Sequence, residues 1–96
     1  MPSKTKSNVF FWVYVLESLK DGNHYIGYTE NLKRRLEEHK QGYNFSTKFR
    51  MPFKTIYIEG CLNQEDAKQR ERYLKTTAGR RFLAQRLKKY KSSYSI

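Results

Sequence analysis

The chain has 96 residues, of which 38% are hydrophobic and 16% aromatic, and its 20 Lys and Arg against nine Asp and Glu leave a formal net charge of +11. A chain of this length can bury one compact core, which excludes a second domain, and its aromatic content excludes a disordered composition. The charge favours a polyanionic partner, above all nucleic acid. An acidic membrane surface and a solvated basic face without a partner are the alternatives.

The cysteine count and the hydropathy pattern favour a cytoplasmic protein. The one cysteine, Cys61, cannot form an internal disulfide, and no Cys and His cluster has zinc spacing. Residues 1–8 lack an apolar signal core, and no apolar run approaches the roughly 20 residues that span a bilayer. We therefore expect a flexible leader over residues 1–8, a folded domain over residues 9–90 and a C-terminal tail over residues 91–96, with no membrane insertion.

Two strands joined by a tight turn open the predicted fold. Residues 10–16 are almost continuously apolar and rich in aromatic and β-branched side chains, as in a central strand covered on both faces. Asp21 and Gly22 form a strong hairpin-turn signal, and a second strand is expected over residues 24–29.

This hairpin is predicted to place two tyrosines on one face. A connection of two or four residues centred on the turn pairs residues whose numbers sum to 43, so that Tyr14 faces Thr29 and Leu16 faces Gly27. Tyr14 and Tyr25 then share a face, and Gly27 leaves open space diagonal to Tyr14. A three-residue loop with a bulge would break this parity.

A helix should follow the hairpin, capped by Thr29 or Asn31 and ending at Gly42. At about 100° per residue, its positions form one inward stripe. That stripe consists of Leu32, Leu36, His39 and Tyr43. Arg35 lies beside the stripe, so we expect Arg35 and His39 to face the core.

A polar, aromatic and basic loop is expected over residues 41–51, where Lys48 and Arg50 could contact phosphates. Pro52 then opens a third strand over residues 53–62.

The next predicted helix carries an unusual carboxylate. Asn63 is an N-cap candidate for a helix that should reach about Lys75. Ala67 and Leu74 mark its apolar stripe, and Glu71 falls between them. A carboxylate in a core-facing stripe requires a partner.

The last segment, residues 76–90, is predicted as one basic amphipathic helix, with Thr76 or Thr77 as its cap. Its apolar positions are Phe82, Leu83, Leu87 and Tyr90. Its basic positions, expected to form a solvated or nucleic-acid-facing surface, are Arg80, Arg81, Arg86, Lys88 and Lys89.

Three polar side chains therefore point into apolar faces: Arg35, His39 and Glu71. Together with Tyr14 and Tyr25 they could form a phosphodiester-hydrolysing site, which needs a carboxylate for a metal, a cation for the developing charge and a proton acceptor. One carboxylate favours a single Mg²⁺ held mainly by water and substrate oxygens. A tyrosine base has an unperturbed pKa of about 10, which nearby Arg or Lys charge would lower.

Each of these residues also has a purely structural interpretation. Tyr14 and Tyr25 could be core tyrosines with their hydroxyl groups at the rim. Arg35 and Glu71 could pair with each other, and His39 could simply complement the negative end of its helix dipole.

At these residues the sequence resembles the GIY-YIG nuclease superfamily, in particular its small single-domain bacterial members. The first motif is matched loosely by Val13-Tyr14-Val15 and the second intact by Tyr25-Ile26-Gly27. Arg35 and His39 follow at the family spacing, and the run from Arg70-Glu71 to Tyr73-Leu74-Lys75 is similar to the metal-carboxylate helix. The resemblance covers residues 12–89.

The resemblance implies an α+β fold, a three-stranded antiparallel sheet flanked by helices in the order β-β-α-β-α-α, and single-metal hydrolysis of nucleic acid. Tyr14 would be the general base, and Tyr25 would position water or phosphate. Arg35 would stabilise the transition state, Glu71 would bind Mg²⁺ or Mn²⁺, and His39 would be an auxiliary proton or phosphate contact.

Three departures from the family pattern stand out. Val13 replaces the glycine of the first motif, and Tyr28, predicted to face away from Tyr14, stands where repair-type members often have lysine. The chain has no asparagine beyond Asn63, whereas many members use one after the metal carboxylate. A protein partner could therefore be needed for activity or specificity.

The function expected from the sequence is metal-dependent endonuclease activity, with structure-selective cleavage in repair or recombination and DNA favoured over RNA. The alternative is a non-catalytic nucleic-acid-binding module that uses the same basic surface. The side chains expected to contact nucleic acid are Lys48, Arg50, Lys75, Arg80 and Arg81.

Overall fold

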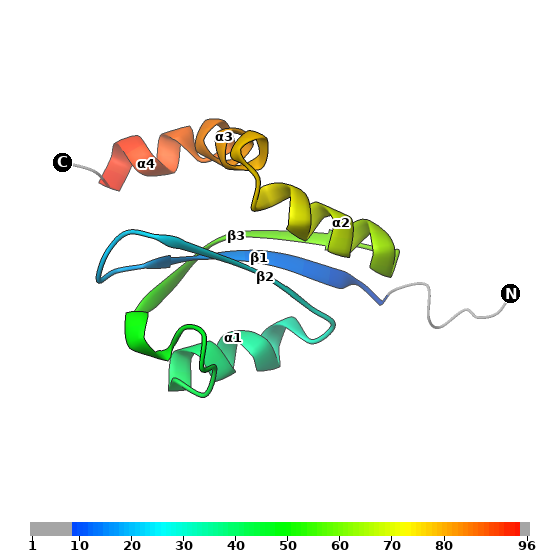
Figure 1. The fold of residues 1–96 in the computed structure, drawn as a ribbon, viewed down its shortest axis with the longest axis horizontal. Coiled ribbons are helices and arrows are strands. Elements are labelled where there is room, and N and C mark those ends of the chain that lie inside the picture. The colour runs from blue at the N-terminus through cyan, green and yellow to red at the C-terminus, as the bar shows by residue number, and fades with distance from the viewer. Residues whose placement is uncertain (1–8, 95–96) are drawn as a thin grey trace, which may run out of the picture.

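The computed structural model, which describes residues 9–94, has one antiparallel sheet between two unequal layers of helices (Figure 1). Its strands are β1 (Phe11–Ser18), β2 (His24–Thr29) and β3 (Phe53–Cys61), in the order β2-β1-β3. Helix α1 (Leu32–Gln41) covers one face. The other side carries α2 (Gln64–Leu74), α3 (Thr77–Arg86) and α4 (Lys88–Tyr94). The predicted fold class is confirmed.

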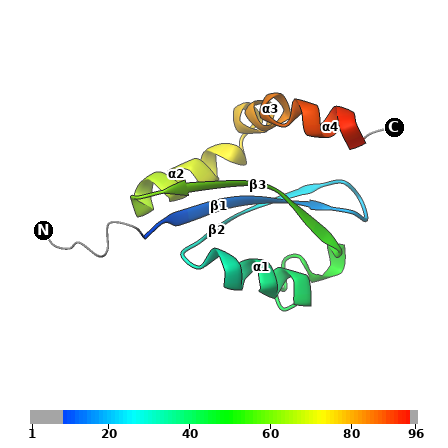
Figure 2. The same ribbon diagram turned by 180° about the vertical axis from the view of Figure 1, so that it is seen from behind.

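Strand β1 is central because it is apolar on both sides. Val13 and Val15 belong to the main core, with Ile26 of β2 and with Ala67 and Leu74 of α2. The alternate positions of β1 lie on the other face and are buried as well. The view from behind shows α1 on that side of the sheet (Figure 2). The strand therefore separates an aliphatic core on the α2 side from a more polar interior on the α1 side.

The hairpin register differs by two residues from the predicted one. Tyr14 pairs with Gly27 and Leu16 with Tyr25, so paired numbers sum to 41 rather than 43. The turn is therefore centred one residue nearer the N-terminus than predicted, and in it the hydroxyl group of Ser18 accepts hydrogen bonds from the backbone N–H groups of Lys20 at 3.1 Å and Asp21 at 3.3 Å. A shift of two keeps every side chain on its predicted face. Gly27 is thus directly opposite Tyr14 rather than diagonal to it.

The caps of the helices follow the local sequence signals. Asn31 caps α1 by accepting from the backbone N–H of Arg34 at 3.0 Å, and Gly42 ends the helix in the left-handed conformation with φ of 80°. Asn63 caps α2 in the same way, and Thr76 caps α3. The predicted starts and ends of α1 and α2 and the predicted start of α3 are confirmed.

The C-terminal segment contains two helices rather than the single predicted one, with a break at Leu87 between α3 and α4. Helix α4 continues to Tyr94, past the expected start of a tail at residue 91, whereas the expected leader lies outside the described residues. Gly79 lets α3 approach α2 closely, because a Cβ atom there would lie 2.6 Å from Cα of Leu74. Over residues 9–94, the helices are too short or too polar to cross a membrane.

Candidate active site

Tyr14 lies at the centre of the α1 face and is fully buried. Its ring covers Gly27 so closely that a Cβ atom on residue 27 would come within 2.9 Å of Tyr14 Cε1 and nearer still to the hydroxyl end of the ring. The second motif therefore needs glycine because the tyrosine of the first motif occupies the space above it.

His39 of α1 connects Tyr14 to the loop that follows the helix. Its Nε2 atom lies 2.8 Å from the hydroxyl group of Tyr14, and its Nδ1 atom lies 2.8 Å from the hydroxyl group of Thr47. All three side chains are buried. In a neutral imidazole one nitrogen donates and the other accepts, so the two bonds form a directional chain from Tyr14 to Thr47. These bonds, rather than the helix dipole alone, account for the buried imidazole.

Tyr25 completes an aromatic cluster around the imidazole. Its ring centroid lies 5.2 Å from that of His39 and 6.3 Å from that of Tyr14, and the His39 and Tyr14 centroids are 5.6 Å apart. Such tilted and edge-to-face contacts are favourable arrangements for aromatic rings. The predicted common face of Tyr14 and Tyr25 is therefore confirmed.

Arg35 lies on α1 one turn before His39, as predicted, and is mostly covered. Its Nε atom is 3.1 Å from a carboxylate oxygen of Glu38, but the contact lacks hydrogen-bond geometry, and this buried Nε donates to no acceptor among the described residues. Glu38 also pairs with the exposed Arg34 at 3.7 Å. Arg35 thus keeps an unused donor beside the tyrosines, where an anionic group could accept a hydrogen bond.

The electrostatics of Tyr14 correct one expectation. Burial raises the pKa of Tyr14 well above its usual value, the neighbouring Tyr25 raises it further, and the charge and hydrogen bond of Arg35 oppose this only in part. Burial also lowers the pKa of His39, helped by the charge of Arg35 and opposed by Glu38. Tyr14 is thus a neutral phenol next to a neutral imidazole, and not a phenolate stabilised by basic neighbours.

Glu71 does not lie in this cluster. Helix α2 packs on the opposite side of the sheet, where Ala67 and Leu74 contact the aliphatic core. The Glu71 side chain is 17% exposed, and its ion-pair partner is Lys75 at 2.6 Å, not Arg35. The alternative in which Arg35 and Glu71 pair with each other is therefore wrong.

The donor set limits what metal site the chain could form. Residues 9–94 contain no group of three or more His, Cys, Asp or Glu side chains placed to hold an ion. A Mg²⁺ ion can nevertheless be held through one carboxylate, with water and phosphate oxygens as its other ligands. Glu71 fits that mode because it is a partly exposed carboxylate, although its ion pair with Lys75 would have to open.

The cations expected to contact nucleic acid lie in two separate groups. Lys48 and Arg50 belong to the segment between α1 and β3, where Arg50 lies 3.6 Å from Asp21. Lys75, Arg80 and Arg81 lie on the α2 and α3 side of the sheet and are exposed. The two groups flank the sheet and do not form one patch.

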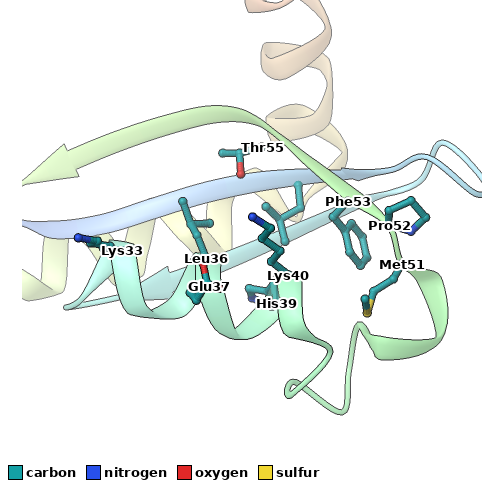
Figure 3. Close-up of a pocket in the computed structure, with 10 residues that line it drawn as sticks. Lys33, Leu36, Glu37, His39, Lys40, Met51, Pro52, Phe53 and Thr55 are labelled. Carbon is teal, nitrogen blue, oxygen red and sulfur yellow. The ribbon is translucent and has the colours of Figure 1, made fainter.

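A cavity of about 520 Å³ lies between α1 and the start of β3 (Figure 3). His39 reaches it from α1, and Phe53 and Thr55 line it from β3. Tyr25 and Arg35 do not line this cavity, and His39 is the member of the aromatic cluster that does.

Three features of the site were not anticipated. Thr47 is the partner of His39, Glu38 is the partner of Arg35, and Tyr43, expected in the inward stripe of α1, is 77% exposed because the chain turns at Gly42. A buried imidazole requires a partner for each nitrogen, which is a signal that some polar residue must reach it. The loop sequence alone does not indicate which one.

Fold and site together define a class of protein: a small α+β domain whose sheet presents two tyrosines to a helix with an inward-facing Arg and His. The family described as the GIY-YIG catalytic domain matches residues 10–91, and the chain belongs to this nuclease family.

Its relatives carry less specific names. A UPF0213 protein of Streptococcus pneumoniae serotype 4 is 43% identical over 65 residues, which are 67% of this chain and 65% of that protein. A UPF0213 protein of Bacillus licheniformis is 40% identical over 73 residues, which are 75% of this chain and 71% of that protein. The chain thus spans just under two thirds of the pneumococcal relative. No solved structure matches it significantly.

Proposed function

We propose that this chain is a metal-dependent endonuclease that hydrolyses phosphodiester bonds, with structure-selective DNA cleavage in repair or recombination as its role. The observation that supports it most is the buried hydrogen bond of 2.8 Å between Tyr14 and His39, in a chain of the GIY-YIG family. A tyrosine placed this way has a proton acceptor ready at its hydroxyl group.

Tyr14 and His39 would act together as the base. A phenol with a raised pKa does not lose its proton readily to water, but the neutral imidazole of His39 can accept that proton. As water attacks phosphorus, its proton would pass to the oxygen of Tyr14 while the phenolic proton passes to Nε2 of His39. Thr47 would then accept a hydrogen bond from Nδ1 of His39 and stabilise the imidazolium.

Arg35 would bind the phosphate. Its buried Nε lacks a hydrogen-bond acceptor, and the planar guanidinium group matches the geometry of phosphate oxygens. A preorganised cation aimed at the charge that develops in the transition state is an effective form of catalysis. Tyr25, which packs on His39, would position the phosphate or the water.

Glu71 would hold the metal ion, which would supply charge stabilisation at the phosphate. Strand β2 is an edge strand, and α2 contacts both β2 and β1. A nucleic-acid strand lying across the open edge of β2 could therefore meet Arg35 from one face of the sheet and Glu71 from the other.

The test is cleavage of linear, flapped, branched and single-stranded DNA and of RNA, with Mg²⁺ or Mn²⁺. We expect Arg35→Ala and Glu71→Gln to lose cleavage, whereas the matched variants Arg34→Ala and Glu65→Gln keep it. Arg34 lies on the same helix but is exposed, and Glu65 lies on the same helix as Glu71. Circular dichroism checks the folds. Cleavage that survives Glu71→Gln would contradict the assignment of the metal ligand.

A non-catalytic nucleic-acid-binding module is the second candidate. Two features favour it. The raised pKa of Tyr14 keeps its phenol protonated, and the ion pair with Lys75 occupies the carboxylate of Glu71 that a metal ion would need. Tight binding of the panel without cleavage by either metal would support it. If a protein partner instead restores cleavage, we would infer that the partner supplies the specificity, or a group equivalent to the asparagine that many family members have after the metal carboxylate.

A further inference from the structure

The segment between α1 and β3 exposes three aromatic rings next to the buried site. Tyr43 is 77%, Phe45 76% and Phe49 67% exposed. Scattered exposed apolar side chains are normal, but rings grouped within seven consecutive residues form an apolar patch of the kind that marks an interaction surface. We call residues 43–50 the aromatic segment.

The backbone of the aromatic segment is held although its rings are exposed. Thr47, in its middle, is buried and bonded to His39 at 2.8 Å. At its end, the carbonyl group of Arg50 accepts from the hydroxyl group of Ser18 at 2.8 Å, and that of Phe49 accepts from Lys20 at 3.3 Å. The rings are therefore displayed from a framework that is fixed before any ligand binds, which reduces the entropy lost on binding.

A cation lies over the faces of two of the rings. Nζ of Lys48 is 5.4 Å from the ring centroid of Phe45 and 5.0 Å from that of Phe49, and the two centroids are 6.1 Å apart. An ammonium group beside exposed rings places a phosphate-binding cation next to aromatic surfaces on which unpaired bases can stack. A duplex hides the faces of its bases, so it offers these rings no stacking partner.

We propose that the aromatic segment is a stacking platform for unpaired bases, with Lys48 on the adjoining phosphate. This deepens, and rests on, the proposed nuclease function, because it names single-stranded or flapped nucleic acid as the substrate class. The link to the site is Thr47: the residue that holds the segment in place also fixes the imidazole that bonds to Tyr14. A strand stacked on the segment is thereby held beside the hydrolytic site.

The test measures binding with chelator present, so that it does not depend on cleavage. Fluorescence anisotropy compares a labelled single strand with a blunt duplex of the same length, for wild type, Phe45→Ala, Phe49→Ala and Phe49→Leu. Leu62→Ala is the matched control, because Leu62 is an equally exposed apolar residue, at 63%, beyond the end of β3.

We expect each alanine variant to weaken single-strand binding by at least about fivefold, the lower end of what the loss of one stacked base produces. Duplex binding should change by less than about twofold, because contacts to duplex phosphates remain. Phe49→Leu should behave like Phe49→Ala, since leucine keeps the apolar volume but has no aromatic face. Leu62→Ala should match wild type.

Two results would overturn the proposal. One is alanine variants that bind the single strand as tightly as wild type does. The other is equal weakening of single-strand and duplex binding, which would show that the rings do not stack on unpaired bases. A wild type that stacks single strands but cuts nothing would contradict the nuclease function alone, whereas cleavage without strand preference would contradict the platform alone.

Discussion

The hydroxyl group of Tyr14 and Nε2 of His39 are 2.8 Å apart, and both side chains are buried between the sheet and α1. The bond joins a central strand to the last turn of a helix 25 residues later in the chain. It ties the tyrosine of the first motif to a base whose own orientation depends on a third residue, Thr47.

Tyr14→Phe should abolish cleavage and lower stability. The change removes the proton acceptor for water and leaves Nε2 of His39 buried without a partner, a loss of about 1–3 kcal/mol in the free energy of unfolding. Urea denaturation and cleavage assays measure the two effects. Tyr57→Phe is the matched control, because that hydroxyl group bonds to Glu59 at 2.9 Å, outside the site. Cleavage that persists in Tyr14→Phe would rule out Tyr14 as the base.

Thr47→Val should weaken both folding and catalysis, because it keeps the shape of the side chain and removes the partner of His39 Nδ1. We expect a loss of about 1–3 kcal/mol in the free energy of unfolding. Thr47→Ser, which keeps the hydroxyl group, should recover most of the cleavage rate. The exposed Thr55→Val is the control. If valine and serine at position 47 have equal cleavage rates, the hydrogen bond does not position His39.

Stability should decrease as the pH falls below about 6.5, the unperturbed pKa of histidine. Burial lowers the pKa of His39, so the unfolded chain takes up this proton at a higher pH than the folded chain does. The contribution of His39 is therefore present in full above about 6.5 and is lost as the pH falls through the lower folded value. In urea unfolding between pH 5.5 and 8, His39→Gln should show a shallower pH dependence than wild type. If wild type and His39→Gln lose stability equally as the pH falls, His39 is not the group responsible.

Gly27→Ala should destabilise the fold by about 1–3 kcal/mol, the usual effect of an added methyl group in a filled interior. The new Cβ atom would overlap the buried ring of Tyr14, which has nowhere to move beneath α1. Gly60→Ala should cost less, because its nearest neighbours are side-chain atoms of Trp12 and Phe10 at 3.0 and 3.2 Å. Thermal unfolding compares the two. Equal melting temperatures would mean that the Tyr14 ring adjusts freely.

Local patterns in the sequence were enough to predict the three strands, the first two helices and the inward side of α1. Asn31 and Asn63 begin helices and Gly42 ends one because caps satisfy backbone groups through residues only two to four positions away. The inward direction of Arg35 and His39 follows from helical periodicity, which is also local. Tyr14 and Tyr25 share a face as predicted, although the predicted register was wrong by two residues, because side chains alternate between the faces of a strand with a period of two.

The tertiary structure alone decided the chemistry of the site. The pKa of Tyr14 is raised rather than lowered because burial outweighs the charge of Arg35, and burial depends on all the residues packed around the ring. Thr47 reaches His39 because an irregular loop folds back, and Glu71 lies across the sheet from the cluster because α2 packs on the other side of the sheet. These relationships join segments that are distant in sequence, so they are set by packing between elements, which no local pattern of residues encodes.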